Sequence, residues 1–109
     1  MRLDFLSPLT ITINGHNDPP VAVDDNNVVV EDASTPVTGN VKTGVSSNGT
    51  DSTADSDVEG NALTVTQIRP GKEADGGAMT GISGSTTSAN GTEIVGQYGT
   101  LKIGADGSY

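Results

Sequence analysis

Hydrophobic and polar residues alternate over several short stretches of the chain, as they do in strands with one buried face. The clearest case is Leu9-Thr10-Ile11-Thr12-Ile13, where the three aliphatic residues share one face and the two threonines share the other. No window of helical length carries apolar residues at positions i, i+3, i+4 and i+7. Beyond residues 9–13, the pattern predicts short strands over 20–23, 27–31, 35–41, 62–68, 93–95 and 98–103.

The same alternation predicts which side chains point inward. In four of the predicted strands we expect two aliphatic side chains to point inward. These pairs are Val21 and Val23, Val37 and Val41, Leu63 and Val65, and Leu101 and Ile103. Turn residues follow the strands at a spacing near ten, and Gly104-Ala105-Asp106-Gly107 is the clearest turn. This spacing predicts an all-β fold, an antiparallel sandwich.

Two long polar stretches interrupt the strand pattern. Residues 44–61 consist almost entirely of Ser, Asn, Gly, Thr and Asp, and they hold four of the 14 acidic residues. A segment of this length without periodicity is typical of a binding or mobile loop. Residues 71–90 have a similar composition, with Met79 and Ile82 as their only sizeable apolar groups. We interpret this second stretch as a surface loop or insertion.

Composition narrows the classes of function. The chain has 109 residues, no Cys, no Trp, one His and three aromatic residues, and its formal net charge is −9. Its length fits one domain. Without Cys and with one His, the chain lacks a thiol nucleophile and the usual ligands of a zinc site. Three aromatic residues cannot line a sugar-binding cleft, so we expect that the protein is not an enzyme. The negative charge disfavours nucleic acid and anionic membranes as partners. No apolar run is long enough for a membrane span or a signal peptide.

The acidic residues suggest calcium. Asp55-Ser56-Asp57 places two carboxylates at i and i+2 in a loop, and Ca²⁺ prefers six to eight oxygen ligands at flexible angles. The loop lacks the 12-residue frame of an EF-hand. A solvated turn explains the same residues equally well. The pairs Asn17-Asp18 and Glu31-Asp32 are further candidates, although each alone is more typical of a turn or a strand end. His16 stands alone and fits an exposed linker position.

Several of these residues, in this order, resemble the VCBS repeat, a cadherin-like β-sandwich module found in tandem in very large bacterial surface and secreted adhesins. The resemblance covers about residues 8–109 and runs through five segments: Thr10-Ile11-Thr12-Ile13-Asn14-Gly15-His16-Asn17-Asp18-Pro19-Pro20-Val21-Ala22-Val23-Asp24, Val30-Glu31-Asp32, Gly39-Asn40-Val41, Asp55-Ser56-Asp57-Val58-Glu59-Gly60-Asn61-Ala62-Leu63-Thr64-Val65, and Gly99-Thr100-Leu101-Lys102-Ile103-Gly104-Ala105-Asp106-Gly107-Ser108-Tyr109.

The resemblance implies an Ig-like or cadherin-like Greek-key sandwich and a division of the chain. Residues 1–15 are then a leader and the last strand of a preceding repeat, residues 16–20 are the inter-repeat linker, and residues 21–109 are a repeat that lacks its final strands. Either the chain belongs to a longer array, or the strand at Leu9–Ile13 fills the open sheet edge, within one chain or between two.

In cadherin-like arrays the joints between repeats bind Ca²⁺. By position, Asn17 and Asp18 resemble the linker ligands, and Asp55 and Asp57 resemble the paired acids of a loop at the same end. Glu31 resembles the acid at the opposite end, which serves the next joint, and Asp32 is a weaker candidate. The chain has Gly15 and Pro19 where cadherin linkers carry a further acid and a second Asn, so it offers fewer ligands.

Two functions follow as expectations. The first is a non-catalytic structural repeat of a bacterial cell-surface or secreted adhesin, a Ca²⁺-stiffened spacer that supports cell adhesion or biofilm formation, with neighbouring repeats as its partners. The alternative is a carbohydrate- or protein-binding module of an extracellular protein or enzyme, which uses the polar segment 71–90. The location expected in either case is extracellular or on the bacterial surface.

Overall fold

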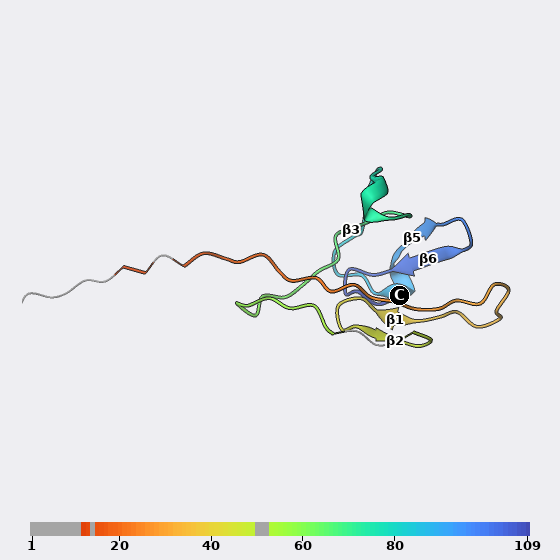
Figure 1. Ribbon diagram of the computed structural model, residues 1–109, viewed down its shortest axis with the longest axis horizontal. Coiled ribbons are helices and arrows are strands. Elements are labelled where there is room, and N and C mark those ends of the chain that lie inside the picture. The colour runs from red at the N-terminus through yellow and green to blue at the C-terminus, as the bar shows by residue number, and fades with distance from the viewer. Residues whose placement is uncertain (1–11, 14, 50–52) are drawn as a thin grey trace, which may run out of the picture.

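The computed structural model describes residues 12–13, 15–49 and 53–109 (Figure 1). Its regular elements are six short strands and two 3₁₀ turns, and no α-helix occurs within these ranges. The strands are β1 (Gly39–Asn40), β2 (Val45–Ser46), β3 (Gln67–Ile68), β4 (Thr80–Gly81), β5 (Thr92–Val95) and β6 (Thr100–Ile103), and the 3₁₀ turns are η1 (Glu73–Asp75) and η2 (Ser88–Asn90). The all-β prediction is confirmed. A search of the described residues finds no helix that could cross a membrane.

The strands pair as three separate antiparallel hairpins, β1 with β2, β3 with β4, and β5 with β6. The last pair is the longest, with Thr92 opposite Ile103 and Val95 opposite Thr100. Its turn is closed by the N–H of Gly96, which donates to the carbonyl of Gly99 at 2.7 Å. The described residues thus form three small sheets in place of the two packed sheets that the sequence predicts, so the sandwich remains a proposal.

A small apolar core lies between these hairpins. Ile103 and Ala105 are almost fully buried, and Ile82 is 9% exposed. Partly buried hydrophobic residues pack against this centre, namely Val41, Val65, Ile68 and Tyr109. The inward orientation predicted for Ile103 is confirmed, whereas Leu101 is 39% exposed and that part of the prediction is wrong. A four-residue strand in a two-stranded sheet buries its residues only where another layer covers them.

The polar segment 71–90 is more than the surface loop expected from its composition. It contains β4, η1 and η2, and it contributes Ile82 to the core. Ile82 donates its N–H to the carbonyl of Thr66 at 2.8 Å, and Thr86 accepts the N–H of Asp106 at 3.1 Å through its carbonyl oxygen. Ile82, Thr86 and Ser88 therefore anchor the segment to the body, whereas most of its other described residues are exposed, as a surface loop predicts.

Two of the predicted valine strands are absent from the described residues. Val28, Val29 and Val30 lie in no ladder and are 57%, 64% and 67% exposed. Val21, which we expected to point inward, is 60% exposed and forms only an isolated bridge with Ser56. Most of the predicted strand 9–13 lies outside the described residues, and its described end, Thr12 and Ile13, is exposed. A β-branched sequence favours an extended backbone but forms a strand only where a partner is present.

The turn predicted at Gly104–Gly107 is confirmed. Gly107 has φ +85° and donates its N–H to the carbonyl of Gly104 at 3.0 Å. The backbone N–H and hydroxyl of Ser108 both donate to Asp106, at 2.9 and 2.6 Å. The Ser108 hydroxyl, then its N–H, and also the charge of Lys42 lower the pKa of the Asp106 carboxyl. The chain after this turn pairs with β1, because Tyr109 and Gly39 exchange backbone hydrogen bonds of 3.0 and 3.1 Å.

Replacing Gly39 by alanine is expected to destabilise the protein by about 1–3 kcal/mol, as overpacking typically does. A Cβ at Gly39 would meet the Tyr109 ring and hydroxyl and would lie 2.6 Å from the backbone carbonyl oxygen of Val45, which cannot move aside. Gly81→Ala in β4 is the matched control, since nothing lies within 4 Å of its Cβ position. Urea unfolding measures both, and equal midpoints for the two variants would contradict the close packing at Gly39.

Candidate calcium site

The loop between residues 55 and 61 folds around one carboxylate. Oδ1 of Asp57 accepts the backbone N–H groups of Glu59 and Asn61, at 2.9 and 3.1 Å. The carbonyl of Asp57 accepts the N–H of Gly60 at 3.0 Å, and Gly60 has φ +74°, a conformation that glycine adopts without strain. These bonds hold the Asp57 side chain in one orientation and turn the chain back into residues 62–65.

The predicted linker and the strand after it are fastened to this loop. Val21 and Ser56 exchange backbone hydrogen bonds of 2.7 and 3.0 Å. Two residues later, the N–H of Val23 donates to Oδ1 of Asp55 at 2.8 Å. The first acid of the Asp-Ser-Asp pair therefore fixes the chain beyond the prolines, while the second shapes the loop.

Asn17 and Asp18 lie against the same loop. The side-chain amide of Asn61 donates to Oδ1 of Asn17 at 2.6 Å, and the backbone N–H of Asp18 donates to Oε1 of Glu59 at 3.0 Å. Both contacts join residues more than forty positions apart. The structure thus brings three of the five predicted ligand residues, Asn17, Asp55 and Asp57, to one pocket, while Asp18 is joined to the loop through its backbone N–H.

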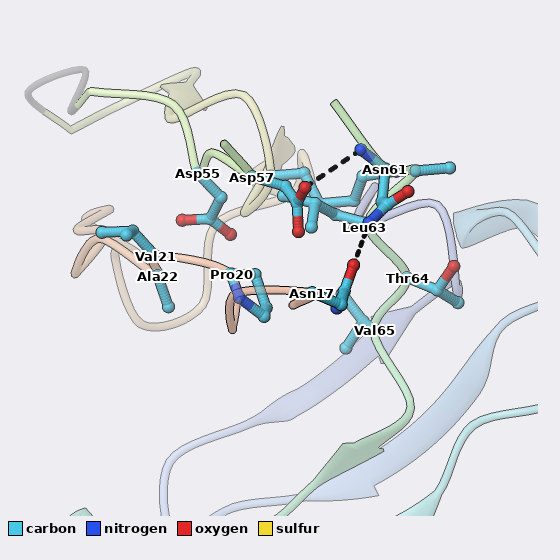
Figure 2. A pocket seen from close by; sticks show the side chains of 12 residues that line it. Asn17, Pro20, Val21, Ala22, Asp55, Asp57, Asn61, Leu63, Thr64 and Val65 are labelled. Atoms are coloured by element: carbon cyan, nitrogen blue, oxygen red, sulfur yellow. Dashed lines mark hydrogen bonds between the residues drawn. The ribbon is translucent and has the colours of Figure 1, made fainter. Parts of the chain in front are cut away.

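A pocket of about 380 Å³ lies between the linker and the loop (Figure 2). Asn17, Asp55, Asp57 and Asn61 contribute polar groups to its lining, and Figure 2 shows the two carboxylates on the side that faces Pro20–Ala22. Both aspartates are half-buried. Lys42 also lines the pocket, but its charge acts on Asp106 at the neighbouring turn.

The donor set consists of hard oxygen atoms. Carboxylate and amide oxygens are the ligands that Ca²⁺ takes at flexible angles, and backbone carbonyls and water complete such sites. Within the described part of the chain, no group of three or more His, Cys, Asp or Glu side chains is arranged to hold a metal ion. The pocket thus offers two carboxylates as charged oxygen donors and the side-chain amides of Asn17 and Asn61 as neutral ones.

Glu31 is separate from this cluster. It lines a groove between residues 27–37 and the β5–β6 hairpin, and Figure 1 shows these elements at the end of the molecule opposite to the one where residues 15–18 depart. Asp32, beside it, has φ +62°. His16 is exposed, as its linker position suggests.

Two residues of the cluster, Glu59 and Asn61, were not among the predicted ligands. Their signal in the sequence is that they follow Asp57 within four positions, in the turn around Gly60. Spacing alone could not show that Glu59 reaches the backbone of Asp18, because that contact depends on how the linker crosses the loop.

The comparisons with known proteins add no relative. No family model matches the chain, and no curated protein or solved structure is significantly similar to it.

Proposed function

We propose that the chain is a non-catalytic structural repeat of a bacterial cell-surface or secreted adhesin, a Ca²⁺-stiffened spacer that supports adhesion or biofilm formation. Residues 16–20 form the joint with a preceding repeat, whose last strand lies within residues 1–15. Residues 21–109 form the repeat itself, with an Ig-like or cadherin-like sandwich as its complete fold. The place of action is outside the cell.

The observation that carries this proposal is the attachment of the linker, and of the first residues that follow it, to the acidic loop. Asn17, Asp18, Val21 and Val23 each hydrogen-bond to a residue of the segment 55–61. A linker with no structural task would be tied to the body at few points. Here the contacts place two half-buried aspartates beside the point where the chain enters the repeat.

The charges explain why an ion would matter at this joint. Asp55, Asp57 and Glu59 lie within five residues of one another, and the linker adds Asp18. Their mutual repulsion opposes the hydrogen bonds that hold the linker on the loop. A bound Ca²⁺ supplies positive charge and oxygen coordination there. The linker is then held at the loop by its own hydrogen bonds without the opposing repulsion.

Calorimetric titration of the EDTA-treated full chain with Ca²⁺ tests the proposal. We expect saturable binding of Ca²⁺ and much weaker binding of Mg²⁺, which demands a stricter octahedral site. Asp57→Asn should weaken Ca²⁺ binding about tenfold or more, because it removes a charged ligand. Asp75→Asn is the matched control, since it removes the same charge from η1, away from the pocket. Equal weakening in both variants would indicate nonspecific attraction to an acidic protein and would count against the site.

A further inference from the structure

A second, larger cavity lies at the other end of the molecule. It is an open groove of about 630 Å³ between residues 27–37 and the β5–β6 hairpin. Its walls are largely apolar, with Val28, Val29 and Val30 on one side and Leu101 on the other. All four are more than a third exposed, so the structure leaves these hydrophobic side chains open to water. Contiguous apolar surface of this kind marks an interaction site.

The two walls of the groove are able to accept a strand. Residues 28–30 are in no ladder within the described part of the chain, although three consecutive valines favour an extended backbone. The opposite wall is a two-stranded sheet, and each strand of such a sheet keeps one side of its backbone unpaired. An extended segment that enters between the walls gains main-chain hydrogen bonds and places alternate side chains on the apolar surface.

The best matching segment is in the chain's own sequence. Leu9-Thr10-Ile11-Thr12-Ile13 is the strictest alternation in the protein, and Ile13 is 87% exposed. Residues 1–13 contain one Arg and one Asp, so the net charge of −9 resides entirely in residues 14–109. The acidic bodies of two copies repel each other. The segment 1–13 has no net charge, so the acidic body of a second copy does not repel it.

The linker directs the chain away from the groove of its own molecule. Val21 and Ser56 exchange backbone hydrogen bonds and Val23 donates to Asp55, so the chain enters the body beside the loop 55–61. Residues 15–20 run out from the body at the end opposite to the groove (Figure 1). The groove of another molecule has no such constraint.

We propose that residues 9–13 of one copy add as a strand to the groove between residues 27–37 and β5–β6 of a second copy. The contact is heterologous, because the donor and acceptor surfaces are different, so each bound copy still offers a free end. Association therefore continues head to tail into open chains. This self-association goes beyond the proposed spacer role and requires no Ca²⁺.

Sedimentation velocity of the full chain in EDTA, over roughly 10 µM to 1 mM, tests the proposal, since a contact of this size has modest affinity. We expect a mass that rises with concentration. Ile11→Asp in the donor and Val29→Asp in the acceptor should each weaken association about tenfold or more, because a charge enters an apolar contact. Thr12→Asp is the matched control, since it adds the same charge on the opposite face of the segment and should associate like the unaltered chain.

Mixing the two defective variants distinguishes this contact from any symmetric one. The Ile11→Asp chain keeps an intact groove and the Val29→Asp chain keeps an intact donor, so the mixture should form a 1:1 dimer and nothing larger. A monomer at every concentration of the unaltered chain would overturn the proposal, and so would association that neither substitution weakens or a mixture that stays monomeric. None of these results bears on Ca²⁺ binding, which is measured separately.

Discussion

Replacing Ile103 by alanine is expected to lower the stability of the protein by about 2–5 kcal/mol, the usual cost of truncating a buried isoleucine. Ile103 is 3% exposed and lies at the centre of a core that otherwise buries only Ile82 and Ala105 among the described residues. Small domains have only about 5–15 kcal/mol in total, and a core this small places the protein near the lower limit. Urea unfolding followed by circular dichroism should show a large fall in the midpoint or a chain that is already unfolded.

Val95→Ala is the control for this experiment. Val95 lies in β5 of the same hairpin but is 74% exposed, so its truncation should change stability by less than about 0.5 kcal/mol. If the two substitutions cost the same, the cluster around Ile103 is not the core of the folded protein.

Adding millimolar Ca²⁺ to the EDTA-treated protein is expected to raise its thermal midpoint. A ligand that binds only the folded state stabilises it by about 2.7 kcal/mol at a concentration 100 times its Kd. In a domain of about this length that free energy raises the midpoint by on the order of 10 °C. The rise comes from removing the repulsion between Asp55, Asp57 and their neighbours when the linker lies on the loop.

The control uses the same pair of variants as the calorimetry. Asp57→Asn should lose most of the Ca²⁺-dependent rise, while Asp75→Asn should keep it. Mg²⁺ at equal concentration controls for ionic strength. A rise of the same size with Mg²⁺, or in the Asp57→Asn variant, would show that general charge screening is the cause.

The sequence predicts the fold class well and its strands only in part. The inward position of Ile103 and the glycine-rich turn at 104–107 are local features, and both are confirmed, whereas the inward position of Leu101 is not. The valines at 28–30 give an equally strong local signal, yet they form no strand within the described residues. Strand formation depends on a partner that lies far away in the sequence, and alternation carries no information about it. The core position of Ile82, within a Gly- and Ser-rich segment, is missed for the same reason.

The sequence likewise predicts only those parts of the candidate site that depend on neighbouring residues. The composition of residues 55–57 indicates a cation by local chemistry, and the structure places Asp55 and Asp57 at one pocket with Asn17. The contact between Asp18 and Glu59 joins positions 41 apart, so no local pattern reveals it. The assignment of Glu31 to a different joint comes from the resemblance to tandem repeats and stays a prediction.

Backbone ¹⁵N relaxation tests most directly whether Ca²⁺ stiffens the joint at residues 16–20. The heteronuclear NOE of Gly15, His16, Asn17 and Asp18 should rise to the level of the β5–β6 hairpin when Ca²⁺ replaces EDTA, since the linker becomes fixed on the loop. The amides of Gly76 and Gly77, in the exposed part of segment 71–90, should not change. Linker amides that stay equally mobile in saturating Ca²⁺ would show that the ion does not stiffen the joint.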